Sequence, residues 1–465
     1  MFASTSYLDM CLRLKNDSPS IATLSHITHV PLVINYSKKT VAQKDVDNIH
    51  LGLQLHGRVR RVTLLAPSPS LHTLLKPMNT SFSRLEHLYL FSTTAEGTTP
   101  VLPEKFQAPD LRHLTLHGIG LPTGLPQLSS VIALSTLSLT HIGASSYFPP
   151  GHLVTRLQGL PYLETLSIGF AIPIPRPSGE GEPLNSPVKL PTLKHFTFQG
   201  LGDYLDNFVA QINTPLLERL DLALFSEIAS TLEKLAEFIQ RAKGLGCPVA
   251  QVNFDKGGPS IEAGYRGQKK VTLCVNCEHP DRQVDSATQV CSAIGRVLSA
   301  VEELTLVDKM PLDRGNTFDN MSWHELLLPF KGVKKLRIGP SLTLGLCQAL
   351  QSVAGGLVPE CLPELQELEV QLDINYARIA FSAFIKSRES MGRPIRLLTP
   401  TTQHAKPEVQ LAIREVDERD PRALHRYTND HGRSYRNQAM ELIDICQTLI
   451  QMQEPTFRSY DELRR

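Results

Sequence analysis

The chain has 465 residues, and because 41% of them are hydrophobic it has enough apolar surface for a large core. Its 47 lysines and arginines almost balance its 46 aspartates and glutamates, and a net charge of +1 is not typical of a protein that binds nucleic acid or an anionic membrane. No apolar run reaches the roughly 18 residues of a membrane helix, and the N-terminus lacks the pattern of a secretory signal.

The first predicted elements belong to an N-terminal capping segment, residues 1–58. A strand is predicted at Pro31–Tyr36 (PLVINY), and a helix at Val41–His56 leads directly into the next strand. This next strand begins at Val59, where the sequence becomes repetitive.

A six-residue phrase, apolar-x-x-apolar-x-apolar, then recurs along most of the chain. It starts at Val59, Leu85, Leu111, Leu134, Leu163, Leu193, Leu217, Val301, Val333 and Leu365. These starts lie 23–32 residues apart, except for one interval of 84 that a weaker copy at Val249 divides. Units of this length are typical of a solenoid, and the phrase is that of the strand in a leucine-rich repeat.

The alternation within each phrase predicts a half-buried strand whose fourth and sixth residues point into the core, as with Leu88 and Leu90. Each strand is followed by a return segment, so we expect neighbouring strands to be parallel. The early return segments are short and rich in Pro and Ser. Helices are predicted in the later ones, at residues 226–243, 286–300, 342–354 and 376–388, and a flexible surface loop is predicted at 172–189.

The predicted fold is therefore α/β, an irregular leucine-rich-repeat solenoid (horseshoe) with a parallel concave sheet and a convex layer of helices and loops. The solenoid spans residues 59–398. A charged C-terminal tail, residues 399–465, follows it and contains one amphipathic helix at Ala439–Met452. This helix either caps the last repeat or lies free.

The candidate binding residues are those that the same alternation places on the concave face. They are His87, Tyr89, Phe91, His113, Thr115, His117, His195, Arg219, Lys335, Arg337 and Glu367. Neighbouring strands lie about 4.8 Å apart, so His87 and His113 are expected side by side. Exposed aromatic and histidine side chains on such a face are typical of a surface that recognises a protein. The alternatives are that these residues only solvate the face, or that the histidines form a metal site or a pH switch.

No part of the sequence points to catalysis or to a cofactor. Cys274 and Cys277 form a CVNC motif near His279, but zinc sites of this kind use a second cysteine pair, so we interpret Cys274 as a buried core residue. His324 begins HELLL with Leu328 at the fifth position, which lacks the second histidine of a zinc protease, and we expect His324 on the surface or at the start of a helix. Eight scattered cysteines indicate a reducing compartment, the cytoplasm or nucleus.

The repeat region resembles the fungal F-box/leucine-rich-repeat-like proteins. The matching stretches are HGRVRRVTLLAPSPSLHTLL, FSRLEHLYLFS, FQAPDLRHLTLHGIGLP and SSYFPPGHLVTRLQGLPYLETLSIGF, and the resemblance covers roughly residues 30–400. In that family an F-box helix bundle docks onto the adaptor subunit of a cullin-RING ubiquitin ligase, and the repeats hold a protein substrate. The resemblance implies a substrate-recognition component of a ubiquitin ligase.

The sequence departs from the family in two ways. The F-box itself is not recognisable, so either it lies upstream of Met1 or this is a repeat-only relative. The Asn or Cys of a regular repeat is also missing, since Thr93 and Thr94 occupy those positions after Leu85. The first hypothesis is therefore a non-enzymatic protein-binding solenoid related to ubiquitin-ligase substrate receptors. The alternatives are a scaffold or receptor-type module without a ubiquitin role, and an enzyme.

Overall fold

The computed structural model describes only part of the chain. The described residues are 12–14, 31–94, 98–122, 128, 130–174, 187–225, 232–265, 268–277, 282–308, 320–339, 342, 346, 350, 361–370 and 381–398. The chain divides into two units, Met1–Pro400 and Thr401–Arg465, and all described residues belong to the first. The predicted tail and its helix lie outside the described residues, as do most of the predicted loop at 172–189 and most of the predicted helix at 342–354.

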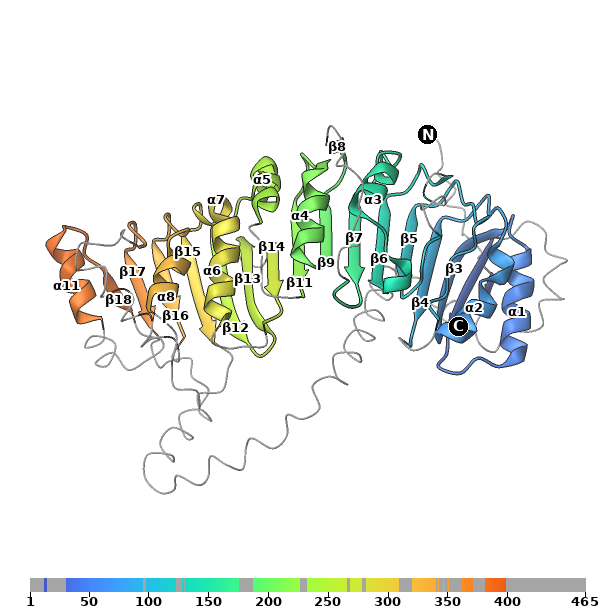
Figure 1. The fold of residues 1–465 in the computed structure, drawn as a ribbon, viewed down its shortest axis with the longest axis horizontal. Coiled ribbons are helices and arrows are strands. Elements are labelled where there is room, and N and C mark those ends of the chain that lie inside the picture. The colour runs from blue at the N-terminus through green and yellow to red at the C-terminus, as the bar shows by residue number, and fades with distance from the viewer. Residues whose placement is uncertain are drawn as a thin grey trace, which may run out of the picture. The chain divides into compact units, whose positions relative to one another are not determined.

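Unit 1 is built on one open, mostly parallel sheet of 16 strands, and helices accompany it (Figure 1). The first strands are β1 (Leu12–Leu14), β2 (Leu32–Ser37), β3 (Val59–Ala66), β4 (His87–Ser92), β5 (His113–His117), β6 (Thr136–Ile142), β7 (Thr165–Phe170), β9 (His195–Gly200) and β11 (Arg219–Leu224). The others are β12 (Val249–Asp255), β13 (Gly258–Tyr265), β14 (Gln268–Val275), β15 (Glu303–Asp308), β16 (Lys335–Ile338), β17 (Glu367–Val370) and β18 (Arg396–Leu398). Every copy of the phrase forms one of these strands, as does the segment predicted at Pro31–Tyr36.

The predicted core positions are confirmed. The strands β4, β5, β6 and β7 lie in register, so that Leu88, Leu114, Leu137 and Leu166 form one continuous row. Each of these four side chains is at most 1% exposed. Burying a leucine contributes roughly 1.5–3 kcal/mol, so the row is a main source of the stability of the sheet.

The helices lie along one face of the sheet and cover this apolar lattice (Figure 1). They are α1 (Gln43–Gln54), α2 (Ser68–Leu74), α3 (Pro150–Leu157), α4 (Gly202–Ala210), α5 (Glu233–Arg241), α6 (Gln283–Ala293), α7 (Gly295–Leu298), α8 (Asn320–Leu327) and α11 (Ser382–Ser390). Helix α1 confirms the helix predicted at Val41–His56. Even the Pro/Ser-rich return after β3 forms a short helix, α2, because Pro69 lies in its first turn, where no backbone N–H is needed.

The prediction of parallel neighbours is wrong at one place. In the interval of 84 residues the chain forms an antiparallel meander, β12–β13–β14, with the sheet order β11-β14-β13-β12-β15. The turn between β12 and β13 depends on Gly258, whose φ is +118° and whose absent Cβ would lie 2.0 Å from the Val275 carbonyl oxygen. The outer strands of the meander pair in parallel with β11 and β15, so the sheet continues without a break.

A small two-stranded sheet, β8 (Val188–Lys189) with β10 (Ile212–Asn213), lies beside α3 and α4. The helix predicted from Ser226 begins only at Glu233 among the described residues, because Leu232 has a non-helical backbone (ψ 52°). Helix α5 still buries the predicted stripe of Leu235, Phe238 and Ile239.

Candidate binding face of the sheet

The face of the sheet opposite the helices carries the candidate site, and it is called the open face below. Along each strand the residues between the buried ones remain half-buried or exposed, as in the alternation of β4 and β5. The eleven predicted binding residues all lie on this face. Register brings them into three groups, on β4 and β5, on β9 and β11, and on β16 and β17.

The first group begins with two stacked imidazoles. His87 and His113 are paired in register, their ring centroids are 4.5 Å apart and their planes differ by 3°. Tyr89 lies nearly parallel to His87 at 6.2 Å. The sequence prediction that His87 and His113 lie side by side is confirmed, and the short strand spacing is the reason.

A second stack crosses the same strands two residues further along. Phe91 lies 5.7 Å from His117, and His117 lies 5.1 Å from His141. Nδ1 of His117 also makes a 3.0 Å hydrogen bond with Oγ1 of Thr140. His141 is not among the predicted binding residues, because strict alternation assigns the open-face position to Thr140.

A bulge in β6 gives His141 its position. The register between β6 and β7 shifts after Leu139, and His141 adopts a left-handed backbone with φ 55°. A non-glycine residue in this conformation is uncommon and is often found at functional sites. No pattern in the sequence signals this bulge.

The four histidines, His87, His113, His117 and His141, form a cluster that is uncharged at neutral pH. Burial, together with charge repulsion from Arg61, His113, Arg60 and Arg112, lowers the pKa of His87 to about 3. Burial lowers the pKa of His117 to about 4, with a contribution from His141. The pKa values of His113 and His141 are also lowered, mainly by burial.

The middle of the open face carries small hydroxyl side chains and one exposed cationic position. Thr136, Ser138, Thr165 and Ser167 lie in two neighbouring rows on β6 and β7. On the next strands His195 is paired in register with Arg219, and both are exposed. Arg219 is already bound, since its Nε donates to Oδ2 of Asp221 at 2.7 Å.

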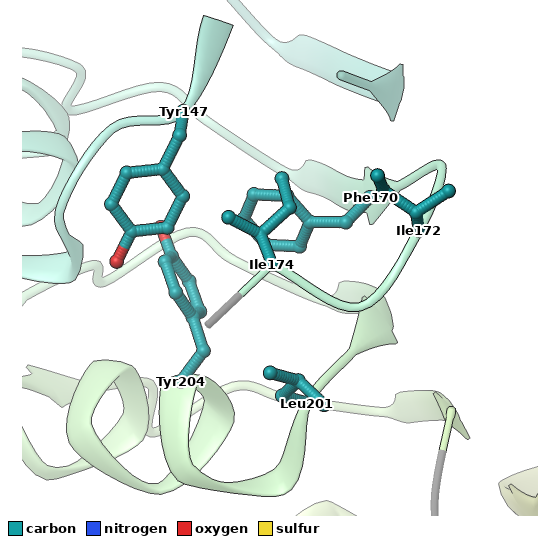
Figure 2. A pocket seen from close by; sticks show the side chains of 6 residues that line it. All are labelled: Tyr147, Phe170, Ile172, Ile174, Leu201 and Tyr204. Carbon is teal, nitrogen blue, oxygen red and sulfur yellow. The ribbon is translucent and has the colours of Figure 1, made fainter. Parts of the chain in front are cut away.

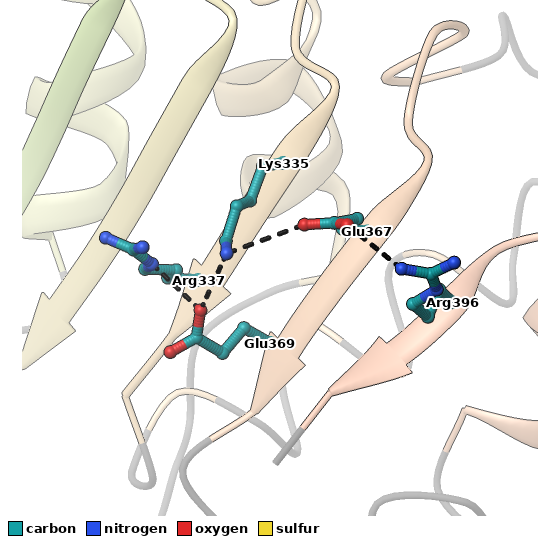
Figure 3. A network of polar contacts seen from close by, with 5 residues as sticks. All are labelled: Lys335, Arg337, Glu367, Glu369 and Arg396. Atoms are coloured by element: carbon teal, nitrogen blue, oxygen red, sulfur yellow. Dashed lines mark hydrogen bonds and ion pairs between the residues drawn. The ribbon is translucent and has the colours of Figure 1, made fainter. Parts of the chain in front are cut away.

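The charged side chains of the third group form ion pairs with one another (Figure 3). Nζ of Lys335 lies 3.5 Å from Oε2 of Glu367 and 3.2 Å from Oε2 of Glu369. Arg337 Nε donates to the same Glu369 oxygen at 2.9 Å, and Arg396 lies 3.8 Å from Glu367. Burial opposes ionisation of Glu369, but the hydrogen bonds from Arg337 and Lys335 outweigh it and lower its pKa. The charges here neutralise one another across β16, β17 and β18.

A separate small crevice lies near the end of β7 (Figure 2). Its six described lining residues are Tyr147, Phe170, Ile172, Ile174, Leu201 and Tyr204. None of the six carries a carboxylate, an imidazole, a thiol or an ammonium group. Tyr204 uses its hydroxyl to donate to the Phe148 carbonyl at 3.2 Å, so the crevice is part of the aromatic core around α4.

Two sequence interpretations are wrong in detail. Cys274 lies half-buried on the open face, because β14 places it in the alternation opposite to the core residue Leu273, whereas the other described cysteines, among them Cys277 and Cys291, are buried. Burial raises the pKa of Cys274, and Glu262 raises it further.

His324 is not on the surface: α8 packs against α6, which leaves His324 only 3% exposed.

No protein-family model matches the chain, and no curated protein matches it. Within the described part of the chain, no group of three or more His, Cys, Asp or Glu side chains is arranged to hold a metal ion, and His279 lies outside that part. None of the described helices is both long and apolar enough to span a bilayer.

Proposed function

We propose that the chain is an irregular leucine-rich-repeat solenoid that binds another protein through the open face. The support for the solenoid is the regular return of the phrase, one strand per copy, with neighbouring copies parallel outside the meander. Stacked units of this kind bury one continuous apolar lattice and leave a long surface for a partner.

The observation that carries the binding function is the pair of aromatic stacks on β4–β6. Tyr89, Phe91 and the four histidines place rings on a face that no described element covers, although rings are costly to leave half in water. Aromatic side chains held rigidly in this way are typical of the centre of a protein interface, because binding them costs little side-chain entropy.

We further propose that the bound protein is a substrate and that the chain is the substrate-recognition component of a ubiquitin ligase in the cytoplasm or nucleus. This step rests on the resemblance of the repeat stretches to F-box/leucine-rich-repeat-like proteins. The proposed partner besides the substrate is the adaptor subunit of a cullin-RING ligase. Catalysis is not part of the proposal.

The ligase role is tested by co-purification of the native transcript product with adaptor and cullin subunits. Recovery of both subunits supports the role. Their absence, in an assay where a known F-box protein recovers them, removes the ubiquitin part and favours the alternative, a repeat scaffold or receptor-type module. A different type of domain encoded upstream of Met1 also favours this alternative.

The position of the binding face is tested by the double substitution His87→Ala and Tyr89→Ala. Partner capture from cell extract, quantified by mass spectrometry, should fall at least tenfold, while the melting temperature changes little because both residues lie outside the core lattice. The matched control is His152→Ala with Tyr162→Ala, which removes the same two side-chain types from exposed positions away from the stacks. Equal capture by the two double variants would place the site elsewhere.

A further inference from the structure

The corner of the open face beside the first histidine stack carries cations that lack counterions. Arg61 on β3 is paired in register with His87, and Arg112 directly precedes His113; both arginines are exposed. Neither has an ion-pair partner among the described residues. Among the described residues Glu86 is the acidic group that raises the pKa of His113, and it is already bound to Nε of Arg60 at 3.0 Å.

These arginines act on the stacked rings. Arg61 and Arg112 both disfavour the charged form of His87 and of His113, so their positive field reaches the centre of the stack. A bound anion at this corner would meet two cations and two neutral imidazoles. This is the opposite of the situation at β16–β18, where every cation of the network already faces a carboxylate.

His87 has a second property that suits an anion. Its Nδ1 is buried and has no hydrogen-bond partner among the residues that the structure describes. A buried N–H without an acceptor is costly, so the proton of the neutral ring resides on the other nitrogen, Nε2. His87 can then donate a hydrogen bond through Nε2 without becoming charged.

We propose that Arg61, Arg112 and His87 recognise a carboxylate side chain of the protein partner, and that an apolar or aromatic side chain next to it packs against Tyr89 and Phe91. Arginine suits this role because its planar guanidinium binds a carboxylate through two parallel hydrogen bonds. The inference rests on the proposed function, since it specifies which protein segment the open face binds.

A nucleic acid is the less suitable ligand for this corner. Two unpaired arginines neutralise few phosphates, and phosphate contacts supply most of the affinity of nucleic-acid complexes. His87 and His113 also cover each other at 4.5 Å, so these ring faces are not available for stacking on a base. An acidic peptide needs only one carboxylate site with apolar contacts beside it.

The test uses two synthetic peptide libraries and the full chain. In the first library a central Asp or Glu is flanked by randomised Phe, Leu, Tyr and Ala; in the second the acid is replaced by Asn or Gln. Fluorescence anisotropy should show at least tenfold tighter binding of the acidic library. Equal binding of both libraries, or binding of neither, overturns the carboxylate proposal, whereas the capture experiment with His87 and Tyr89 decides the binding face independently.

The residues are tested by Arg61→Gln with Arg112→Gln. This pair should lose the preference for the acidic library and bind both libraries equally, while thermal melting shows that the fold is kept. Arg396→Gln, an exposed arginine at the other end of the same face, is the matched control and should keep the preference. Loss of the preference in the control as well, or tighter binding of a single-stranded oligonucleotide than of the acidic library, overturns the proposal.

Discussion

Strands β3–β6 and strands β16–β18 both present side chains to the open face, but they fill these positions differently. At β3–β6 the positions hold stacked neutral rings with Arg61 and Arg112 beside them. At β16–β18 they hold cations and carboxylates that pair across the strands. A partner that binds the first region has only to cover rings and neutralise arginines, whereas one that binds the second must first break existing ion pairs. This difference favours the first region as the proposed docking surface, although the second carries more charge.

The largest loss of stability is expected from substitutions of buried leucines, and it should be the same beneath both regions. Leu114→Ala and Leu368→Ala remove buried leucines, 1% and 0% exposed, beneath the first and the second region. Each should lower the free energy of unfolding by about 2–5 kcal/mol in urea titrations, because each leaves a cavity. The open-face controls Thr115→Ala and Thr305→Ala should change it by only about 0.5 kcal/mol. A leucine that costs no more than its threonine control would show unequal packing beneath the two regions.

The second effect separates the regions by pH. The folded-state pKa values of His87 (about 3) and His117 (about 4) lie below the unfolded value of 6.5, so their neutral forms contribute stability above that pH, and it is lost as pH falls. Between pH 7 and pH 5 the free energy of unfolding should fall by about 1–2 kcal/mol more for the wild type than for the double variant His87→Gln with His117→Gln. This figure allows for the partial exposure of the two histidines.

The matched variant for this pH experiment is Glu369→Gln. The pKa of Glu369 is lowered from 4.5, so its contribution is present above 4.5 and is lost only as pH falls below that value. Between pH 7 and pH 5 this variant should therefore lose as much stability as the wild type. Parallel curves for the wild type and the double histidine variant would contradict the assignment of neutral histidines to the first region.

The smallest effect concerns salt. Glu369→Gln removes a carboxylate bound to Lys335 and Arg337, and it should cost about 0.5–1 kcal/mol in dilute buffer because these side chains are partly exposed. The cost should shrink in 1 M NaCl, where charges are screened within about 3 Å. Arg61→Gln should show no comparable salt-dependent loss in thermal melting. A larger salt dependence at Arg61 than at Glu369 would reverse the comparison.

Much of the sheet could be predicted from the sequence because its signal is local. An apolar residue at every second position defines a strand and its buried side wherever it occurs, and the phrase supplied both. The proximity of His87 and His113 followed from this pattern alone, since equal phrases on neighbouring strands lie in register.

The remaining features depend on contacts between segments far apart in the sequence. The ion pairs of Lys335 with Glu367 and Glu369 depend on a register across 32 and 34 residues, which the spacing of the phrases allows but does not specify as ion pairing. The burial of His324 depends on the packing of α8 against α6. The position of His141 depends on a backbone conformation that sequence alternation does not encode.

The meander at β12–β14 also bears on how such an array can grow. Because the meander has three strands, an odd number, its first and last strands run in the same direction. This is also the direction of the strands on either side of the meander, so β15 pairs in parallel with β12. A meander of only two strands between β11 and β15 would leave one of its strands antiparallel to the neighbour outside the meander. Gly258 begins the second strand of this meander, and a Cβ there would lie 2.0 Å from the Val275 carbonyl oxygen, so the return of the chain from β12 into β13 depends on a residue without a side chain.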